Sequence, residues 1–346
     1  MAGKKVAVAL SGGEDSSVAA LLLKKEGYEV LGMYMCLSDA PCSQPQLCQA
    51  ERICHSLDIP FHVVDLRREF ERGVIDYFSQ EYQRGRTPNP CVACNQHIKF
   101  GCLLSQALSL GVQYLATGHY ARIKHRDGRY HLFEGIDAAK EQSYFLYTLT
   151  QEKLGHILFP LGGYKKTEVR RIAKQEGLPA IGKPSQDICF VSQKNYRDFL
   201  KQRFGNAAGD IVDRRGKILG HHQGVAFYTV GQRHGLGVAS GRPLYVLEII
   251  PEDNRIILGE GRELYHREIA ASNLCWVAGA APSEPAGITA RIRYRAPQAE
   301  AVLFPEGDLA TVFFSEPQWA VAPGQAVVFY NGEEVLGGGI IENMKS

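Results

Sequence analysis

Short apolar runs alternate with helix-like stretches along the first third of the chain. The apolar runs are typical of strands buried on both faces, and they lie at residues 6–10, 28–35, 61–66 and 112–117. Between them, residues 16–25 and 46–57 have the pattern of helices. Strands separated by helices pair in parallel, so the pattern predicts an α/β fold with a doubly wound parallel sheet. Ligands of such sheets bind beyond the carboxyl ends of the strands.

The pattern changes near residue 206, where Gly-rich turns begin to separate short strand-like segments. After about residue 266 the chain reads as all-β: residues 288–295 alternate strictly, and Asn331-Gly332 between apolar runs is a hairpin signal. These changes predict a division into residues 1–205, 206–265 and 266–346.

Composition and charge narrow the classes of protein. Hydrophobic residues make up 45% and charged residues 22%, as in ordinary globular chains, and the net charge is only +2. Residues 140–265, however, carry 19 basic and 13 acidic side chains, an excess that favours a local polyanion site. The sequence has no apolar run of transmembrane length, no signal-peptide pattern and an odd number of cysteines, nine. We therefore expect a cytoplasmic protein whose cysteines are ligands, nucleophiles or core residues.

The turn between the first strand and the first helix, residues 11–17, reads Ser-Gly-Gly-Glu-Asp-Ser-Ser. Glycines let a ligand approach the backbone, and a helix start favours anions. The hydroxyls of Ser11, Ser16 and Ser17 can donate to phosphate oxygens, and Asp15 suits a shared Mg²⁺. The Lys of a Walker motif is absent. The alternative is a Ser/Gly-rich turn that only begins a helix.

Two cysteines stand three residues apart in a Pro-rich loop, and a third lies far along the chain. Cys91 and Cys94 could bind metal, form a redox pair or supply an activated thiolate. A helix expected over residues 96–107 would lower the pKa of Cys94. Cys189 by itself could equally be a small core residue. The remaining cysteines have no ligand spacing and read mainly as core residues; they are Cys36, Cys42, Cys48, Cys54, Cys102 and Cys275.

Two basic segments are candidates for phosphate contacts. The predicted helix 165–174 has four basic residues in its first seven. Along the predicted strand 288–295, alternation places Arg291, Arg293 and Arg295 on one side, and a row of guanidinium groups suits phosphates. The alternative in both segments is a solvated face.

The sequence resembles a known family at this point. Ser-Gly-Gly-x-Asp-Ser is similar to the pyrophosphate loop of the ATP-pyrophosphatase superfamily, with Glu14 where an apolar residue is usual. Further blocks resemble the tRNA-specific 2-thiouridylases and occur in the family's order along the whole chain; they are residues 87–90, 94–95, 98–100, 116–120, 142–146, 185–190, 229–237, 293–295 and 322–327.

The resemblance implies a catalytic pyrophosphate-loop domain (1–205), a small central tRNA-binding domain (206–265) and a C-terminal antiparallel β-barrel (266–346). It implies that ATP and Mg²⁺ are used to adenylate the carbon-2 oxygen of the wobble uridine, in the anticodon loop of tRNA, before sulfur replaces that oxygen. By resemblance, Cys189 carries a persulfide received from a sulfur-relay protein or cysteine desulfurase, and Cys94 is the second catalytic cysteine.

The resemblance also implies two sets of contact residues. The ATP-binding positions are Ala9, Leu10, Ser11, Gly12, Gly13, Asp15, Ser16, Ser17, Met35 and Gly118. The tRNA-binding positions are Asn89, Pro90, Cys91, His119, Lys140, Glu141, Gln142, Arg293, Tyr294 and Gln325.

One position departs from the family. Cys91 stands where Asp is common, so the chain offers three thiolates, Cys91, Cys94 and Cys189. Three thiolates are suitable ligands for a four-iron, four-sulfur ([4Fe-4S]) cluster, as in other thiolases of the superfamily. Since nothing else in the loop accounts for a thiol at 91, the sequence slightly favours the cluster over a persulfide route with Cys91 as spectator. Two other functions remain open: an ATP-pyrophosphatase acting on a small metabolite, and a non-enzymatic sulfur-carrier or tRNA-binding protein.

Overall fold

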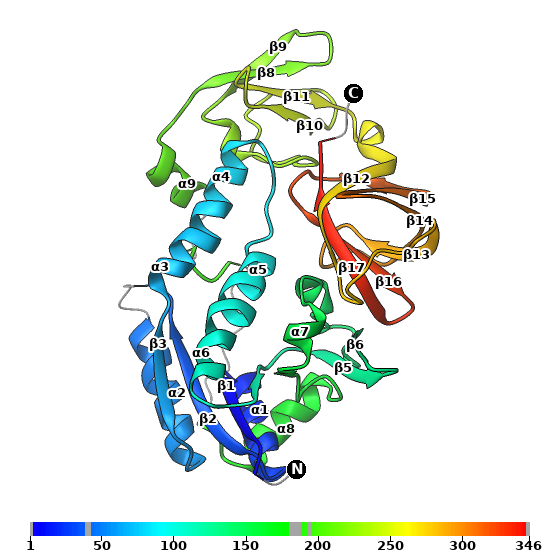
Figure 1. The fold of residues 1–346 in the computed structure, drawn as a ribbon. Coiled ribbons are helices and arrows are strands. Elements are labelled where there is room, and N and C mark those ends of the chain that lie inside the picture. The colour runs from blue at the N-terminus through cyan, green and yellow to red at the C-terminus, as the bar shows by residue number, and fades with distance from the viewer. Residues whose placement is uncertain (1–2, 39–42, 180–187, 192–195, 344–346) are drawn as a thin grey trace.

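Three sheets organise the chain (Figure 1). The structure, a computed structural model, describes residues 3–38, 43–179, 188–191 and 196–343. A five-stranded parallel sheet forms the N-terminal part, a four-stranded sheet lies in the middle of the chain, and an eight-stranded antiparallel sheet includes the C-terminal strands. The predicted fold class is thereby confirmed.

The parallel sheet has the strand order β3-β2-β1-β4-β7. Its strands are β1 (Lys5–Ala9), β2 (Glu29–Cys36), β3 (Phe61–Asp65), β4 (Tyr114–Ala116) and β7 (Ile157–Leu158). All four predicted strands form, and β7, which is too short to give a sequence signal, adds the edge. Val6, Ala7 and Val8 are fully buried because helices cover both faces of the sheet.

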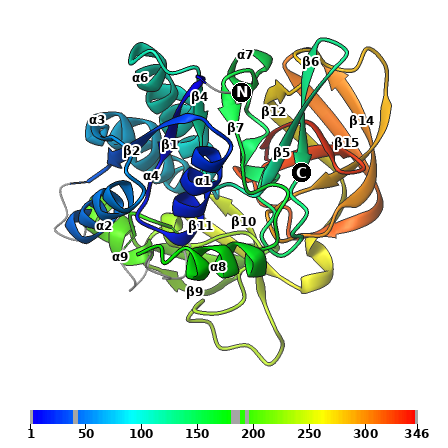
Figure 2. The ribbon, with the colours of Figure 1, turned by 90° about the horizontal axis from the view of Figure 1, so that it is seen from below.

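The helices form two layers around this sheet. One core joins Val6 and Val8 to helices α1 (Glu14–Lys25), α2 (Ser43–Ser56) and α8 (Lys166–Gln175). These helices lie together in the view from below (Figure 2). The other core joins Ala7 to two consecutive helical runs. Those runs are α3 (Arg67–Phe70), η1 (Glu71–Asp76) and α4 (Tyr77–Gln83), followed by α5 (Pro90–Ala93), η2 (Cys94–Leu103) and α6 (Leu104–Ser109).

The central sheet packs on the end of α4. Its strands are β8 (Gly209–Asp213), β9 (Ile218–His222), β10 (Tyr245–Ile250) and β11 (Arg255–Gly259), preceded by α9 (Tyr196–Phe204) and interrupted by η4 (Val225–Phe227). Phe78 and Tyr82 of α4 share a buried core with Ile211, Val246 and Ile256 of this sheet. The central part is therefore fixed directly to the helical layer of the parallel sheet.

The C-terminal strands close into a barrel. Strands β12 (Tyr265–Trp276), β13 (Ala286–Arg291), β14 (Ala299–Glu306), β15 (Leu309–Trp319), β16 (Ala326–Asn331) and β17 (Glu334–Ile341) form a ring, which the β12–β17 pairing completes. The hairpin of β5 (Ala121–Arg126) and β6 (Arg129–Glu134) joins this sheet through Val335 of β17. An N-terminal segment thus extends the barrel sheet.

Three short elements complete the description: η3 (Ser143–Leu146), α7 (Gln151–Leu154) and η5 (Gly261–Leu264). Among the described residues, none of the helices has the length and apolar character needed to cross a membrane.

Candidate active site

The turn after β1 is shaped by two close backbone approaches. Gly12 has a φ of +75°, and a Cβ there would lie 2.9 Å from the carbonyl oxygen of Gln46, so only glycine fits. Gly118, just beyond the end of β4, lies against the start of α1, because a Cβ on it would lie 2.9 Å from the backbone nitrogen of Ser16. The turn and the end of β4 therefore form one surface at the carboxyl edge of the sheet.

The three serines of this turn differ in how open their hydroxyls are to a ligand. Ser16 and Ser17 are buried, and their hydroxyls donate to the carbonyl oxygen of Gly13 at 3.1 and 2.8 Å. Ser11 is exposed, and its hydroxyl lies 3.4 Å from that of Ser16. The hydroxyl of Ser11 is thus the one most open to a ligand, whereas those of Ser16 and Ser17 hold the helix start in place.

A lysine from α8 reaches the same turn. The ammonium group of Lys166 lies 2.6 Å from Oδ1 of Asp15 and 2.8 Å from Oε1 of Glu14, and its side chain is only 17% exposed. The hydroxyl of Tyr120 also donates to Oδ1 of Asp15, at 2.7 Å. The sequence left the basic helix that carries Lys166 as a candidate either for phosphate contacts or for a solvated face, whereas in the structure Lys166 pairs with the turn after β1.

The two close cysteines lie inside a helix. Asn89 caps it: its Oδ1 accepts from the backbone N–H groups of Cys91 and Val92, and Pro90 occupies the first turn. From Pro90 the helical run continues through η2, a π-helical segment, to Ser109. The predicted start at residue 96 was therefore wrong, because the Asn-Pro cap begins the helix earlier.

Burial and the charge of Lys99 act in opposite directions on the pKa of the three thiols. Burial raises the pKa of Cys94, which corrects the expectation that a helix start would lower it. Burial, followed by the neighbouring Cys94 and Cys91, raises the pKa of Cys189 to about 11. Lys99 acts in the opposite direction on all three thiols. Phe190 packs against the core that contains Cys94, so the fold brings the Cys189 segment to the Cys91–Cys94 helix across 95 residues of sequence.

Lys99 also contacts His119. Its ammonium nitrogen lies 3.5 Å from Nε2 of His119, and Nδ1 of the same ring lies 2.7 Å from the hydroxyl oxygen of Thr117. Burial, followed by the charge of Lys99, holds the pKa of His119 well below its usual value. Because an ammonium can only donate, the neutral imidazole carries its proton on Nδ1. His119, which the resemblance gives as a tRNA contact, is thus buried with both nitrogens engaged.

The barrel holds the loop that precedes the cysteines. Nε2 of Gln325 donates to the carbonyl oxygen of Thr87 at 2.8 Å, and the backbone N–H of Thr87 donates to Pro323 at 2.7 Å. Tyr294 packs on Phe145 with ring centroids 4.3 Å apart. Two of the predicted tRNA-contact residues, Gln325 and Tyr294, therefore lie beside the Asn89–Cys94 segment.

Arg291 does not face solvent as the alternation predicted. Its guanidinium lies 2.6 Å from Glu134 of β6 and 2.8 Å from Glu141, whose side chain is 4% exposed. Strand β13 ends at Arg291, so the row of three arginines does not form. Arg293 instead donates to the backbone oxygen of Trp319 and covers that indole ring, at 5.6 Å. Only Arg295 of the three is exposed.

Replacing Arg291 by Met should therefore destabilise the fold. The substitution leaves Glu134 and Glu141 close together and partly desolvated with no cation, which costs about 3 kcal/mol of unfolding free energy. Urea unfolding measures the loss. Arg295→Met, which removes an exposed guanidinium, is the matched control. Equal stabilities for wild type and Arg291→Met would show that this ion network contributes nothing.

The other cysteines are free in the described part of the chain. Cys54 is buried in the core between α2 and the sheet, where burial raises its pKa to about 12, as expected for a core thiol. Cys48 is exposed, while Cys36, Cys102 and Cys275 are partly buried. Cys42 and residues 185–187 of the Cys189 motif lie outside the described residues.

The described residues contain no group of three or more His, Cys, Asp or Glu side chains arranged to hold a metal ion. As placed, the three thiols therefore do not form the ligand set of a cubane cluster. Asp15 is suitable for a Mg²⁺ shared with phosphates, since Tyr120 and Lys166 both contact its Oδ1 and, among the described residues, its Oδ2 has no hydrogen-bond partner.

Sequence reasoning missed the roles of Lys99, Lys166 and Tyr120. Lys99 and Tyr120 fall within motif blocks, and Lys166 within a basic helix, so each carried some signal. The sequence does not show where these side chains point. The packing of α8 on α1 directs Lys166, and the π-helical segment η2 directs Lys99.

The chain is similar to known proteins along nearly its whole length. Three family models match consecutive parts of the chain: the tRNA methyl transferase HUP domain at residues 4–193, the tRNA methyl transferase PRC-barrel domain at 197–260 and the aminomethyltransferase beta-barrel domain at 266–341. Proteins named tRNA-specific 2-thiouridylase MnmA are close in sequence. That of Carboxydothermus hydrogenoformans is 49% identical over 98% of both chains, and that of Moorella thermoacetica is 49% identical over 97% of this chain and 99% of that protein.

Among solved structures, the U34-tRNA thiolase NcsA from Methanococcus maripaludis with its iron–sulfur cluster is 20% identical, with a TM-score of 0.38. It covers 58% of this chain and 64% of that one, a likeness that carries no argument about chemistry. The fold and the turn after β1 place the N-terminal part in the HUP class of nucleotide-binding domains. Within that class, the chain belongs to the tRNA-specific 2-thiouridylase family.

Proposed function

We propose that this protein is an ATP-dependent tRNA-uridine 2-sulfurtransferase, which thiolates the wobble uridine. One observation carries the proposal: Lys99, on the helical run that holds Cys94, contacts His119 just beyond β4, where Gly118 lies against the turn after β1. Family membership supports tRNA as the substrate. Paired thiols and a pyrophosphate-type loop fit sulfur transfer, whereas methyl transfer would use neither.

The loop and its neighbours fit adenylation. The hydroxyl of Ser11, the glycine backbone and the α1 N-terminus face the side where phosphates would bind. Lys166 supplies a cation there, held in place by Asp15 and Glu14. Mg²⁺ held through Asp15 would neutralise phosphate charge. Attack of the carbon-2 oxygen on the α-phosphorus forms a carbon–oxygen–phosphorus link and releases pyrophosphate, which makes that oxygen a leaving group as AMP.

The thiols fit the sulfur step. The terminal sulfur of a Cys189 persulfide attacks carbon 2, and AMP leaves with the oxygen. The Cys94 thiolate then attacks the Cys189 sulfur, which breaks the sulfur–sulfur bond, releases 2-thiouridine and leaves a Cys94–Cys189 disulfide. A thiol reductant returns both to thiols. Lys99 favours the thiolate forms, because it lowers the pKa of both sulfhydryls against the effect of burial.

The tRNA contacts are proposed around the same helix. A stacked wobble base must leave its stack to reach the thiols, at a cost of a few kcal/mol. Asn89 and Pro90 form a capped, rigid turn beside Cys91 that could grip this base. Lys140 is exposed, and its ammonium has no partner among the described residues, so it can contact a phosphate. Glu141 is paired with Arg291 and acts by positioning that side chain.

We further propose that the chain has three domains at 1–205, 206–265 and 266–346. We propose that a sulfur-relay protein or cysteine desulfurase is the sulfur donor and that the protein acts in the cytoplasm.

The test is reconstitution with ATP, Mg²⁺, a persulfide donor and unmodified tRNA. We expect AMP, pyrophosphate and 2-thiouridine in equal amounts, measured by chromatography and mass spectrometry of digested tRNA. Adenylation of a small metabolite without tRNA would favour a different ATP-pyrophosphatase. Binding of tRNA with no AMP formation would favour a non-enzymatic carrier.

A further inference from the structure

A cavity of about 410 Å³ lies at the amino ends of β2, β4 and β7, at the opposite end of the parallel sheet from the turn after β1. Residues from the end of α1, from the β5–β6 hairpin and from α7 complete its wall. Its volume is in the range of pockets that hold small molecules. Among the described residues, none proposed above for ATP, sulfur transfer or tRNA lines it. The cavity therefore has no role in the proposed function.

Aromatic side chains make up much of the cavity wall, and we call it the aromatic cavity. The rings that line it are those of Tyr28, Tyr114, Tyr130, Phe159 and His125. Tyr28 and Tyr114 meet edge to face, with centroids 6.5 Å apart and ring planes at 89°, so they form a corner of two perpendicular faces. Gln151 of α7 holds the backbone of Tyr130 by hydrogen bonds of 2.9 and 2.6 Å. The walls are thus in place before a ligand arrives.

The charges at the aromatic cavity favour a cation. Glu26 is the one carboxylate among the described residues that line it, and no Lys or Arg is among them. Burial, followed by the charge of Glu26, raises the pKa of Tyr28, so the carboxylate acts on the phenol that forms the corner. Glu26 is also the C-cap of α1, where the negative end of the helix dipole lies. Both contributions attract positive charge to the same place.

The nearby lysines are engaged outside the aromatic cavity. Lys24 donates to two carbonyl oxygens just beyond α2, and Lys25 pairs with the carboxylate that follows α8, at 2.5 Å. The ammonium of Lys4, which does not line the cavity, lies 5.5 Å from the centroid of the Tyr114 ring, within cation–π range. The chain therefore already uses one of these rings to bind an ammonium group.

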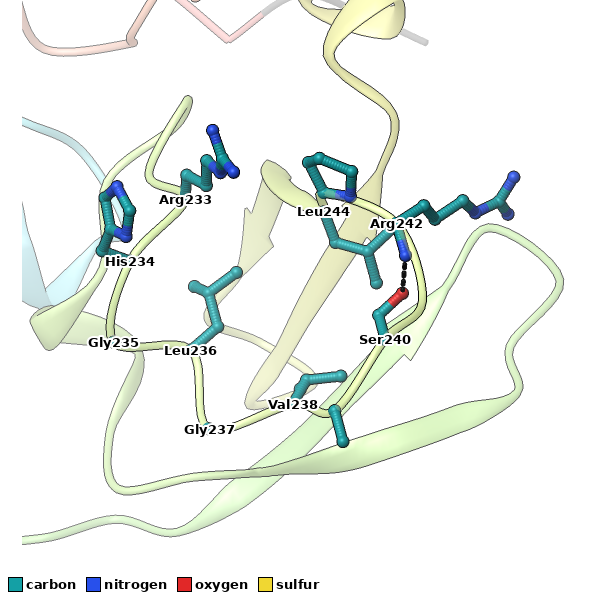
Figure 3. Close-up of a pocket in the computed structure, with 11 residues that line it drawn as sticks. Arg233, His234, Gly235, Leu236, Gly237, Val238, Ser240, Arg242 and Leu244 are labelled. Carbon is teal, nitrogen blue, oxygen red and sulfur yellow. Dashed lines mark hydrogen bonds between the residues drawn. The ribbon is translucent and has the colours of Figure 1, made fainter.

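A second cavity, of about 460 Å³, has the opposite character. It is lined by the loop of residues 233–244 in the central part (Figure 3). Arg233 and Arg242 stand at its rim, and none of its described lining residues is acidic. A cationic ligand should avoid this second cavity, which therefore serves as an internal control.

We propose that the aromatic cavity binds a small molecule with a quaternary or otherwise alkylated ammonium head group. The positive charge lies against the faces of the tyrosine rings, whose π-systems are negative, and Glu26 neutralises it. The alkyl groups lie against Leu23, Ile123 and Leu154. A primary ammonium brings three donors that need acceptors, whereas a quaternary one brings none. A wall made mostly of rings therefore suits the alkylated head group.

Choline is the probe, and neohexanol, which has carbon in place of the nitrogen, is its neutral isostere. In titrations followed by NMR, choline should bind at least about tenfold more tightly than neohexanol. Tyr130→Leu should weaken choline binding about tenfold, and Glu26→Gln about threefold with a smaller dependence on salt. The matched controls are Glu51→Gln, at an exposed carboxylate of α2, and Arg233→Gln in the second cavity, and both should leave the affinity unchanged.

Equal affinities for choline and neohexanol would overturn the proposal, since the cavity would then be a merely apolar pocket. A choline affinity that neither Tyr130→Leu nor Glu26→Gln changes would place the probe elsewhere and would also overturn it, as would absence of choline binding at about 50 mM. Because Glu26 is exposed, its variant should keep the fold even where Tyr130→Leu loses stability, and thermal unfolding checks both. Neither ATP nor tRNA is present, so the outcome is independent of the proposed function.

Discussion

Cys189→Ser should abolish thiolation of tRNA, by about a thousandfold or more, because a hydroxyl cannot carry the transferred sulfur. Cys94→Ser should prevent turnover to a similar depth, since no thiol then cleaves the disulfide that links Cys189 to the sulfur on carbon 2. Both variants should still form AMP when tRNA and ATP are present, because adenylation precedes the sulfur step. Single-turnover assays that measure AMP and 2-thiouridine separately test both statements.

Cys91→Ser is the matched control and the test between the two sulfur chemistries. Under the persulfide route it should retain thiolation within about threefold, since Cys91 neither carries nor resolves sulfur. Under the cluster route, which the sequence slightly favoured, all three thiolates are required and Cys91→Ser should lose iron, sulfide and activity together. The arrangement of the described side chains leads us to expect the first result. Anaerobic purification with iron and sulfide analysis of the wild type and the variant decides it.

Lys166→Met should reduce AMP formation by about a hundredfold or more. Its ammonium is the cation that the fold directs at the pyrophosphate loop, and groups that stabilise transferring phosphates have effects of this size. The affinity for tRNA should stay within about twofold, although the basic helix that carries Lys166 was a candidate for phosphate contacts. Pyrophosphate release measures the first quantity, and filter binding measures the second.

Lys174→Met provides the control, because Lys174 is an exposed lysine on the same helix and should keep both properties. Asp15→Ala should also lose AMP formation, since it removes the carboxylate that holds Lys166 and could share Mg²⁺. If a Lys166→Met variant kept normal AMP formation and bound tRNA more weakly, Lys166 would be a tRNA-binding residue and not part of the ATP site.

The sequence by itself determined the class of the fold and the location of its chemistry. Buried parallel strands must be apolar on both faces, so their runs are readable without the structure, and the chain must turn at their carboxyl ends. The Gly-rich turn after β1 and the cysteines were therefore found from local pattern. The closed barrel came from the resemblance, since alternating strands do not reveal how a sheet closes.

Tertiary structure alone decided which way the long side chains point. Lys166 and Arg291 were both candidates for phosphate contacts, yet carboxylates hold them. Glu14 and Asp15 at the start of α1 hold Lys166, and Glu134 of β6 and the buried Glu141 hold Arg291. The pKa of Cys94 went in the opposite direction from the helix-start argument, because the thiol is buried and the helix capped by Asn89 begins six residues earlier than expected. Long flexible side chains take the partner that tertiary packing supplies, and that partner is remote in sequence. Local pattern therefore fixes the backbone elements, while burial and remote charges fix the roles of the residues they carry.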